Sequence, residues 1–78
     1  MTWRSEYASV VTRLRRAREA AGLRQADVST AIGISVRHFA RLESAEIDPT
    51  ALTLFAWAAA VRLRVCLTDM SDAEARSA

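Results

Sequence analysis

Two arginines four residues apart are the side chains of this 78-residue chain that are best suited to molecular recognition. Arg37 and Arg41 share one face if residues 36–44 form a helix, because positions i and i+4 are neighbours on a helix surface. A guanidinium can donate two parallel hydrogen bonds to O6 and N7 of guanine. Val36 is short and apolar, so it could touch a thymine methyl group from the same segment. This spacing therefore indicates contact with base edges.

Two short helices joined by a tight turn would hold these side chains in place. Residues 25–32 and 36–44 each have the composition and apolar spacing of a helix. Gly33 between them can take the left-handed conformation that ends a helix, and Ser35 suits the N-cap of the next one. Such a helix-turn-helix can place its second helix in the major groove of DNA.

Further elements flank this motif on both sides. Residues 5–21 carry apolar side chains at helical spacing, and residues 51–61 follow Thr50, a suitable N-cap. Residues 61–68 alternate apolar and polar side chains, which predicts a β-strand. We therefore expect a mainly α fold, a small bundle of four to five helices that contains the helix-turn-helix and ends in a C-terminal β-strand.

The predicted strand has no partner in its own chain, and a single strand is not a stable sheet. Helix 51–61 has only one polar residue, Thr53, whereas a surface helix of a monomer is polar on one side. We predict that the strand pairs with its copy across a homodimer; the alternative is a core that wraps helix 51–61 on both sides. The domain would span residues 1–68, with dimerisation at 51–68 and a flexible tail at 69–78. The expected dimer interface consists of Leu52, Phe55, Ala59, Leu63, Val65 and Leu67.

Charge and composition narrow the classes of function. All eleven basic residues are arginines, and residues 4–41 contain eight of them and only three acids. This basic first half is typical either of a phosphate-binding face or of an arginine-rich solvated surface. The chain has no metal-ligand cluster, no Ser/His/Asp set and no glycine-rich phosphate loop, so we expect no enzyme, no cofactor and no metal. No signal peptide or membrane span is visible. We expect a cytoplasmic protein without a membrane partner.

Several motifs together resemble the Cro/lambda-repressor (XRE-type) helix-turn-helix family over residues 10–61. The trailing strand is similar to that of the family's antitoxin branch, in which C-terminal strands pair across a dimer. The chain departs from the family at Arg24, where Ser or Thr usually caps a helix, and at Ala45, where Gly is usual. The motifs that carry the resemblance are Leu14-x3-Arg18-x3-Gly22-Leu23-x-Gln25, Gly33-Ile34-Ser35, Phe39-x2-Leu42-Glu43 and Pro49.

The resemblance implies a role for each matching residue. Arg18 and Glu43 match a structural ion pair between the first and third helices. Arg24 could replace the missing cap with a direct phosphate contact, and His38 has either a phosphate contact or an ordinary surface role. The expected base-reading residues are Val36, Arg37, Ala40 and Arg41, and the expected phosphate-binding residues are Arg24, Gln25, Ser35, His38 and Ser44.

The resulting hypothesis is an autoregulating repressor from a bacterium or phage. It would bind double-stranded DNA at a palindromic operator as a homodimer, in association with the nucleoid. One alternative is an antitoxin that binds both operator DNA and a toxin protein. Another is a protein-interaction module that has the fold without DNA binding.

Overall fold

The computed structural model of the protein describes residues 2–77, which form five helices and no strand. The expected mainly helical fold is therefore confirmed, with helix bounds close to the predicted ones. No helix in this range is both long and apolar enough to cross a membrane. In chain order the helices are α1 (Trp3–Ala20), α2 (Gln25–Ile32), α3 (Val36–Glu43), α4 (Ala51–Ala60) and α5 (Asp72–Ser77).

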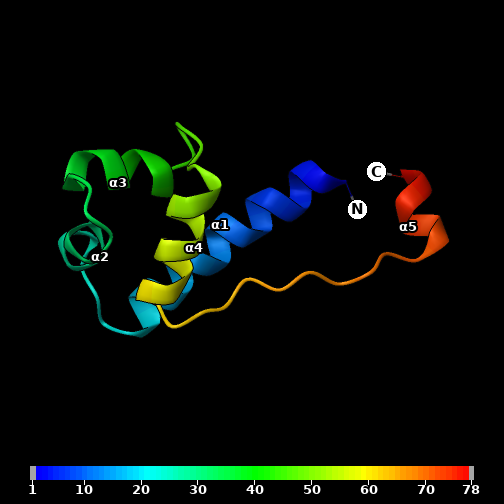
Figure 1. Ribbon diagram of the computed structural model, residues 1–78. Coiled ribbons are helices and arrows are strands. Elements are labelled where there is room, and N and C mark those ends of the chain that lie inside the picture. Colours follow the sequence, from blue (N-terminus) through cyan, green and yellow to red (C-terminus); the bar gives the residue numbers. More distant parts are fainter. Residues whose placement is uncertain (1, 78) are drawn as a thin grey trace.

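The first four helices enclose one apolar core. Helix α2 packs against α3 and α4, and α1 packs against α3, so that α3 lies along one side of the bundle (Figure 1). Phe39 of α3 and Trp57 of α4 are fully buried and meet edge to face, with ring centroids 5.1 Å apart. Their contact fixes α3 to the body of the domain. The buried apolar residues are Val11, Leu14, Val28, Phe39, Leu42, Trp57, Ala58 and Val61.

Local hydrogen bonds define where three of these helices begin. The hydroxyls of Thr2, Ser35 and Thr50 accept from the backbone N–H three residues on, at 3.3, 3.1 and 3.1 Å respectively. Arg24 occupies the same position before α2, but a guanidinium has no acceptor and makes no such cap. Instead, the carboxylate of Asp27 accepts from the Arg24 backbone N–H at 2.8 Å. The unusual N-cap is thus compensated from inside the helix.

A residue with left-handed backbone follows each of the four bundle helices. Gly22 and Gly33 have φ of 70° and 77°, whereas Ala45 and Arg62 adopt 63° and 64° with ordinary side chains. This conformation lets the chain satisfy carbonyls at a helix end, as when the Leu63 N–H donates to the Ala58 carbonyl at 2.8 Å. An L-residue in this region is strained. At position 45, where the related family usually has glycine, Ala45 takes the left-handed conformation that glycine adopts more easily.

The predicted β-strand at residues 61–68 is not formed in the part of the chain that the structure describes. Residues 63–71 are extended but form no ladder, and they lead to α5 inside the segment that we expected to be a flexible tail. We call residues 63–77 the C-terminal arm. A strand needs a neighbouring strand for its backbone groups, and residues 2–77 contain none. Pairing with a second copy therefore remains a prediction.

The C-terminal arm runs beside the domain as far as Thr68, which lines a hollow with Val10 of α1, and then leaves it. Leu63 and Val65 are partly buried against the core of their own chain, whereas Leu67 is 98% exposed. The radius of gyration is 13.6 Å, and a compact chain of this length would have about 11.5 Å. Figure 1 shows the extended segment leading away from the bundle toward α5. Leu63 and Val65, which we expected in a dimer interface, thus have intramolecular contacts as well.

Candidate nucleic-acid interface

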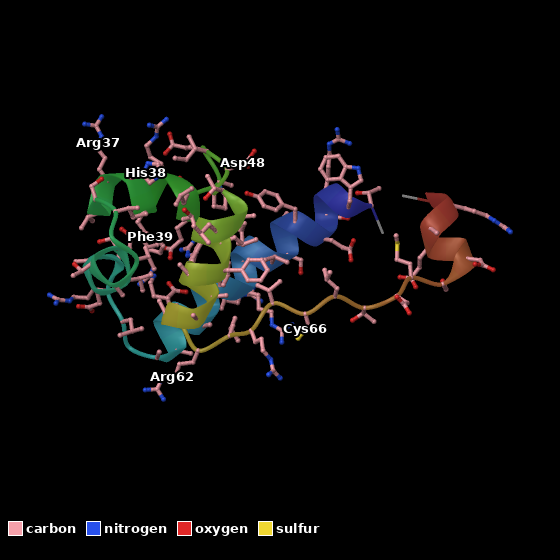
Figure 2. The ribbon with its side chains drawn as sticks, in the orientation of Figure 1. Arg37, His38, Phe39, Asp48, Arg62 and Cys66 are labelled. Carbon is pink, nitrogen blue, oxygen red and sulfur yellow. The ribbon has the colours of Figure 1, made fainter. Side chains whose placement is uncertain are left out.

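Helix α3 divides sharply into a buried face and an exposed face. Phe39, Leu42 and Glu43 are buried, while Arg37, His38 and Arg41 are exposed. In Figure 2 the Arg37 side chain points away from the bundle, and Phe39 lies on the inner side of α3. A helix anchored along one side by apolar packing presents the other side as a rigid platform.

The expected base-reading residues fall on this exposed platform. Arg37, Ala40, Arg41 and Ser44 are spaced i, i+3, i+4 and i+7, so they form one stripe along α3. Val36 is 46% exposed at the start of the helix. Neither Arg37 nor Arg41 has an ion-pair partner among residues 2–77. Both guanidinium groups therefore keep all their donors for a ligand.

A part-buried hydrogen-bond network joins α1, α2 and α3 behind the stripe. Arg18 donates to Glu43 through Nε at 2.7 Å and through Nη2 at 2.8 Å, and its Nη1 donates to the Leu23 carbonyl at 2.8 Å. Gln25 Nε2 donates to Oε1 of the same carboxylate at 2.9 Å. The bonds to Glu43 raise the pKa of Arg18. The carboxylate thus fixes both the guanidinium and the amide of Gln25.

The start of α2 carries a second, exposed pair. Arg24 Nη2 lies 3.0 Å from Asp27 Oδ1, and this contact raises the pKa of Arg24 and lowers that of Asp27. Among the described residues, the backbone N–H groups of Gln25 and Ala26 have no acceptor. The start of a helix with free N–H groups favours an anion, so this end of α2 has the electrostatics for a phosphate.

The chain matches a family model over most of its length. The model of a helix-turn-helix domain matches residues 10–74, which is most of the chain. The chain belongs to the helix-turn-helix domain family. The type is Cro/lambda-repressor-like, as the sequence motifs indicated. Searches of curated proteins and of solved structures found no match.

Membership in the helix-turn-helix family relates the exposed stripe on α3 to DNA binding. In this motif the second helix is the one that enters the major groove, and here α2 and α3 are joined by Gly33, Ile34 and Ser35. The family indicates DNA as the partner and regulation of transcription as the role. Helix α3 holds the position of this second helix, and we call it the recognition helix.

The expected phosphate-binding residues lie at both ends of the recognition helix and at the start of α2. The Ser35 hydroxyl accepts from the His38 N–H as the N-cap, so its own proton is free to be donated. The Ser44 hydroxyl lies 3.3 Å from the Arg41 carbonyl and 3.2 Å from Glu46 Oε2, and both of these oxygens are acceptors. Because the hydroxyl has a single proton, it must give up both contacts to donate to a phosphate. His38 is exposed on the outer side of α3 (Figure 2).

One hollow brings three of the expected DNA-binding residues together. Gln25, Ala40 and Ser44 line a space of about 220 Å³ with Arg18, Glu43 and Arg15. Sequence reasoning did not select Arg15. The available signal was its place on α1, because Arg15 lies one turn before Arg18 and so shares its side of the helix.

Sequence reasoning also missed a contact that holds the loop between α3 and α4. The Tyr7 hydroxyl donates to Asp48 Oδ1 at 3.0 Å, which ties the first turns of α1 to this loop. Burial and the Asp48 carboxylate raise the pKa of Tyr7. Residues far apart in the sequence make this bond, so periodicity and capping rules give no indication of it.

Proposed function

We propose that this chain is a sequence-specific transcriptional repressor that binds a palindromic operator as a homodimer and controls its own operon. Each copy lays α3 in a major groove, and the two half-sites lie one helical turn apart, about 10–10.5 bp, or a multiple of it. Occupying the operator excludes the polymerase. The protein works in the cytoplasm, on DNA of the nucleoid.

The stripe on α3 is the observation that carries this proposal. Arg37 and Arg41 are exposed, one turn apart and without ion-pair partners in the described residues. The buried side chains of Phe39 and Leu42 hold the same helix from behind. Arginine in bidentate contact with guanine is the commonest base-specific contact in the major groove. A rigid helix with two such side chains supports direct reading of sequence.

The exposed face of α4 supports the homodimer. Leu52 and Phe55 are 82% and 55% exposed, and with Ala56 and Ala59 they follow the i, i+3, i+4, i+7 spacing of one helix face. Contiguous apolar surface on a small domain marks an interaction site. Two-fold symmetry would bring the same face of a second copy against it and match the symmetry of a palindrome.

Binding to the protein's own upstream DNA tests the repressor directly. Footprinting and fluorescence anisotropy should give a protected palindrome and tighter binding than to a scrambled duplex. Arg37→Ala or Arg41→Ala should each weaken operator binding by ~1–3 kcal/mol and relax the preference at one base pair. Arg76→Ala, an exposed arginine outside both the helix-turn-helix and the expected dimerisation segment 51–68, is the matched control. Equal affinity for operator and scrambled DNA would refute sequence-specific repression.

Sedimentation of surface variants tests the dimer. Leu52→Glu places a charge on the exposed face of α4 and should produce a monomer without unfolding the domain, since Leu52 is 82% exposed. Leu67→Glu is the corresponding change in the C-terminal arm. A monomer from Leu67→Glu alone would assign dimerisation to the arm, and wild-type protein that is monomeric at the concentrations of DNA binding would contradict the homodimer.

The C-terminal arm favours an antitoxin as the second candidate. Its residues 64–70 make no backbone hydrogen bonds within the described chain, and Leu67 and Met70 are exposed. An extended segment with free backbone groups and apolar side chains suits addition to the sheet of another protein. Co-purification with the product of a neighbouring gene, lost on removal of residues 66–78, would favour this role. Operator binding by the isolated protein leaves the pure protein-interaction module without support.

A further inference from the structure

We propose that Arg15 of α1 binds a backbone phosphate of the DNA in the hollow formed with Gln25, Ala40 and Ser44. This inference rests on the proposed function, because it assumes that α3 enters the major groove. The hollow measures about 220 Å³, several times the ~30 Å³ that one water occupies in the liquid. A phosphate oxygen can therefore enter the hollow.

The position of the hollow beside the recognition helix is the first argument. A helix with its side chains is ~10–12 Å across and the major groove is ~12 Å wide, so the flanks of an inserted helix lie close to the two backbones. Ala40 and Ser44 belong to the outward stripe of α3 and also line the hollow. The hollow thus opens on one flank of the stripe, where a backbone would pass.

The charges around the hollow are the second argument. Glu43 is the acid that lines it, and its two oxygens already accept hydrogen bonds from Arg18 and Gln25. Arg18 balances the charge of that carboxylate. Among the residues that line the hollow, Arg15 therefore supplies the remaining positive charge, and one further acid lies at the edge, Glu46, whose Oε2 is 3.2 Å from Ser44 Oγ. The second Nε2 hydrogen of Gln25 has no acceptor among the described residues.

The freedom of the Arg15 side chain is the third argument. Its one ion-pair contact in the described chain is with Glu19, at 3.8 Å, with both side chains more than half exposed. Exposed pairs of this kind contribute little. The guanidinium can exchange Glu19 for a phosphate and make the shorter, charge-assisted bonds that it does not make with Glu19.

Salt-dependent binding to the operator duplex tests the role of Arg15. Arg15→Ala should weaken binding roughly tenfold, the size of one hydrogen bond to a charged group. It should make the negative slope of log K against log salt shallower by about 0.9, the value for one phosphate contact. The loss should be the same on operator and scrambled duplexes, because a phosphate contact carries no sequence information. Arg15→Lys should keep most of the slope.

Arg13→Ala is the matched control. Arg13 is an exposed arginine of the same helix, but it lines a different hollow, with Val10, Leu14 and Ala58. An unchanged slope for Arg15→Ala, or an equal loss for Arg13→Ala, would overturn the proposal. If the wild-type protein binds no duplex at all, the proposed function itself fails. If the wild-type protein binds the operator specifically and Arg15→Ala binds it equally well, the phosphate contact of Arg15 is wrong but the proposed function stands.

Discussion

Breaking the Arg18–Glu43 pair should strongly destabilise this domain. The side chains of Arg18 and Glu43 are only 12% and 4% exposed, and two charge-assisted hydrogen bonds of 2.7 and 2.8 Å join them. Glu43→Gln keeps the size of the side chain but removes its charge. The guanidinium of Arg18 is then left buried without a counter-charge, and the Gln25 amide loses its carboxylate acceptor.

The expected loss is a large part of the total stability. Removing one partner of a buried ion pair costs ~3–5 kcal/mol. A domain of 78 residues is expected to unfold with a free energy of roughly 4–12 kcal/mol. Glu43→Gln should therefore lower the free energy of unfolding by about 3 kcal/mol. Replacing both members together, as Arg18→Met with Glu43→Leu, should cost much less, because no buried charge remains.

Urea denaturation followed by circular dichroism at the helix band measures these changes. The exposed Arg15–Glu19 pair, with side chains 59% and 52% exposed, is the internal control. Glu19→Gln should change the free energy of unfolding by less than about 1 kcal/mol. A loss for Glu43→Gln no larger than that of the control would refute the reasoning from burial. A double variant as unstable as the single one would refute the role of the uncompensated charge.

Four further substitutions test local features of the fold. Ala45→Gly should raise the melting temperature by stabilising the domain by about 1 kcal/mol, because Ala45 has φ of 63°, and Gly33→Ala should act in the opposite direction. Arg24→Ser supplies the missing N-cap acceptor, so it should stabilise the domain by about 1 kcal/mol while weakening DNA binding in an anisotropy titration. Tyr7 has a raised pKa in the folded state, so stability present below its unfolded pKa should be lost as the pH rises through the folded value. Tyr7→Phe should flatten this alkaline part of a stability–pH curve; an unchanged curve would contradict the assignment.

Much of the helical architecture could be read from local rules. Ser35 and Thr50 do cap α3 and α4 as expected, and Gly22 and Gly33 follow α1 and α2 with left-handed backbone. Capping and amphipathic spacing act over a few residues, so they leave a direct trace in the sequence. The residues that form the exposed stripe of α3 follow from the same spacing, once Phe39 and Leu42 are assigned to the core.

Other features depend on contacts between distant segments. The alternation of residues 61–68 predicted a strand, but Leu63 and Val65 pack against the core of their own chain without a neighbouring strand. Alternation reports that one side of a segment is buried, and it does not say what covers that side. The bond between Tyr7 and Asp48 likewise has no local signature.

The order of residues alone determined helices α1 to α4, the caps at Ser35 and Thr50, and the pair of arginines on the recognition helix, since each depends on neighbours within one or two turns. Helix α5 was missed, because it lies in the segment that we expected to be a flexible tail. Only the folded chain decided that Arg15 lies beside Gln25 and Ser44, that Ala45 takes a left-handed backbone and that the C-terminal arm has no strand partner of its own. These features arise where α1, α2 and α3 meet or where the chain leaves the bundle. Their energies come from packing between separate elements, which no local pattern encodes.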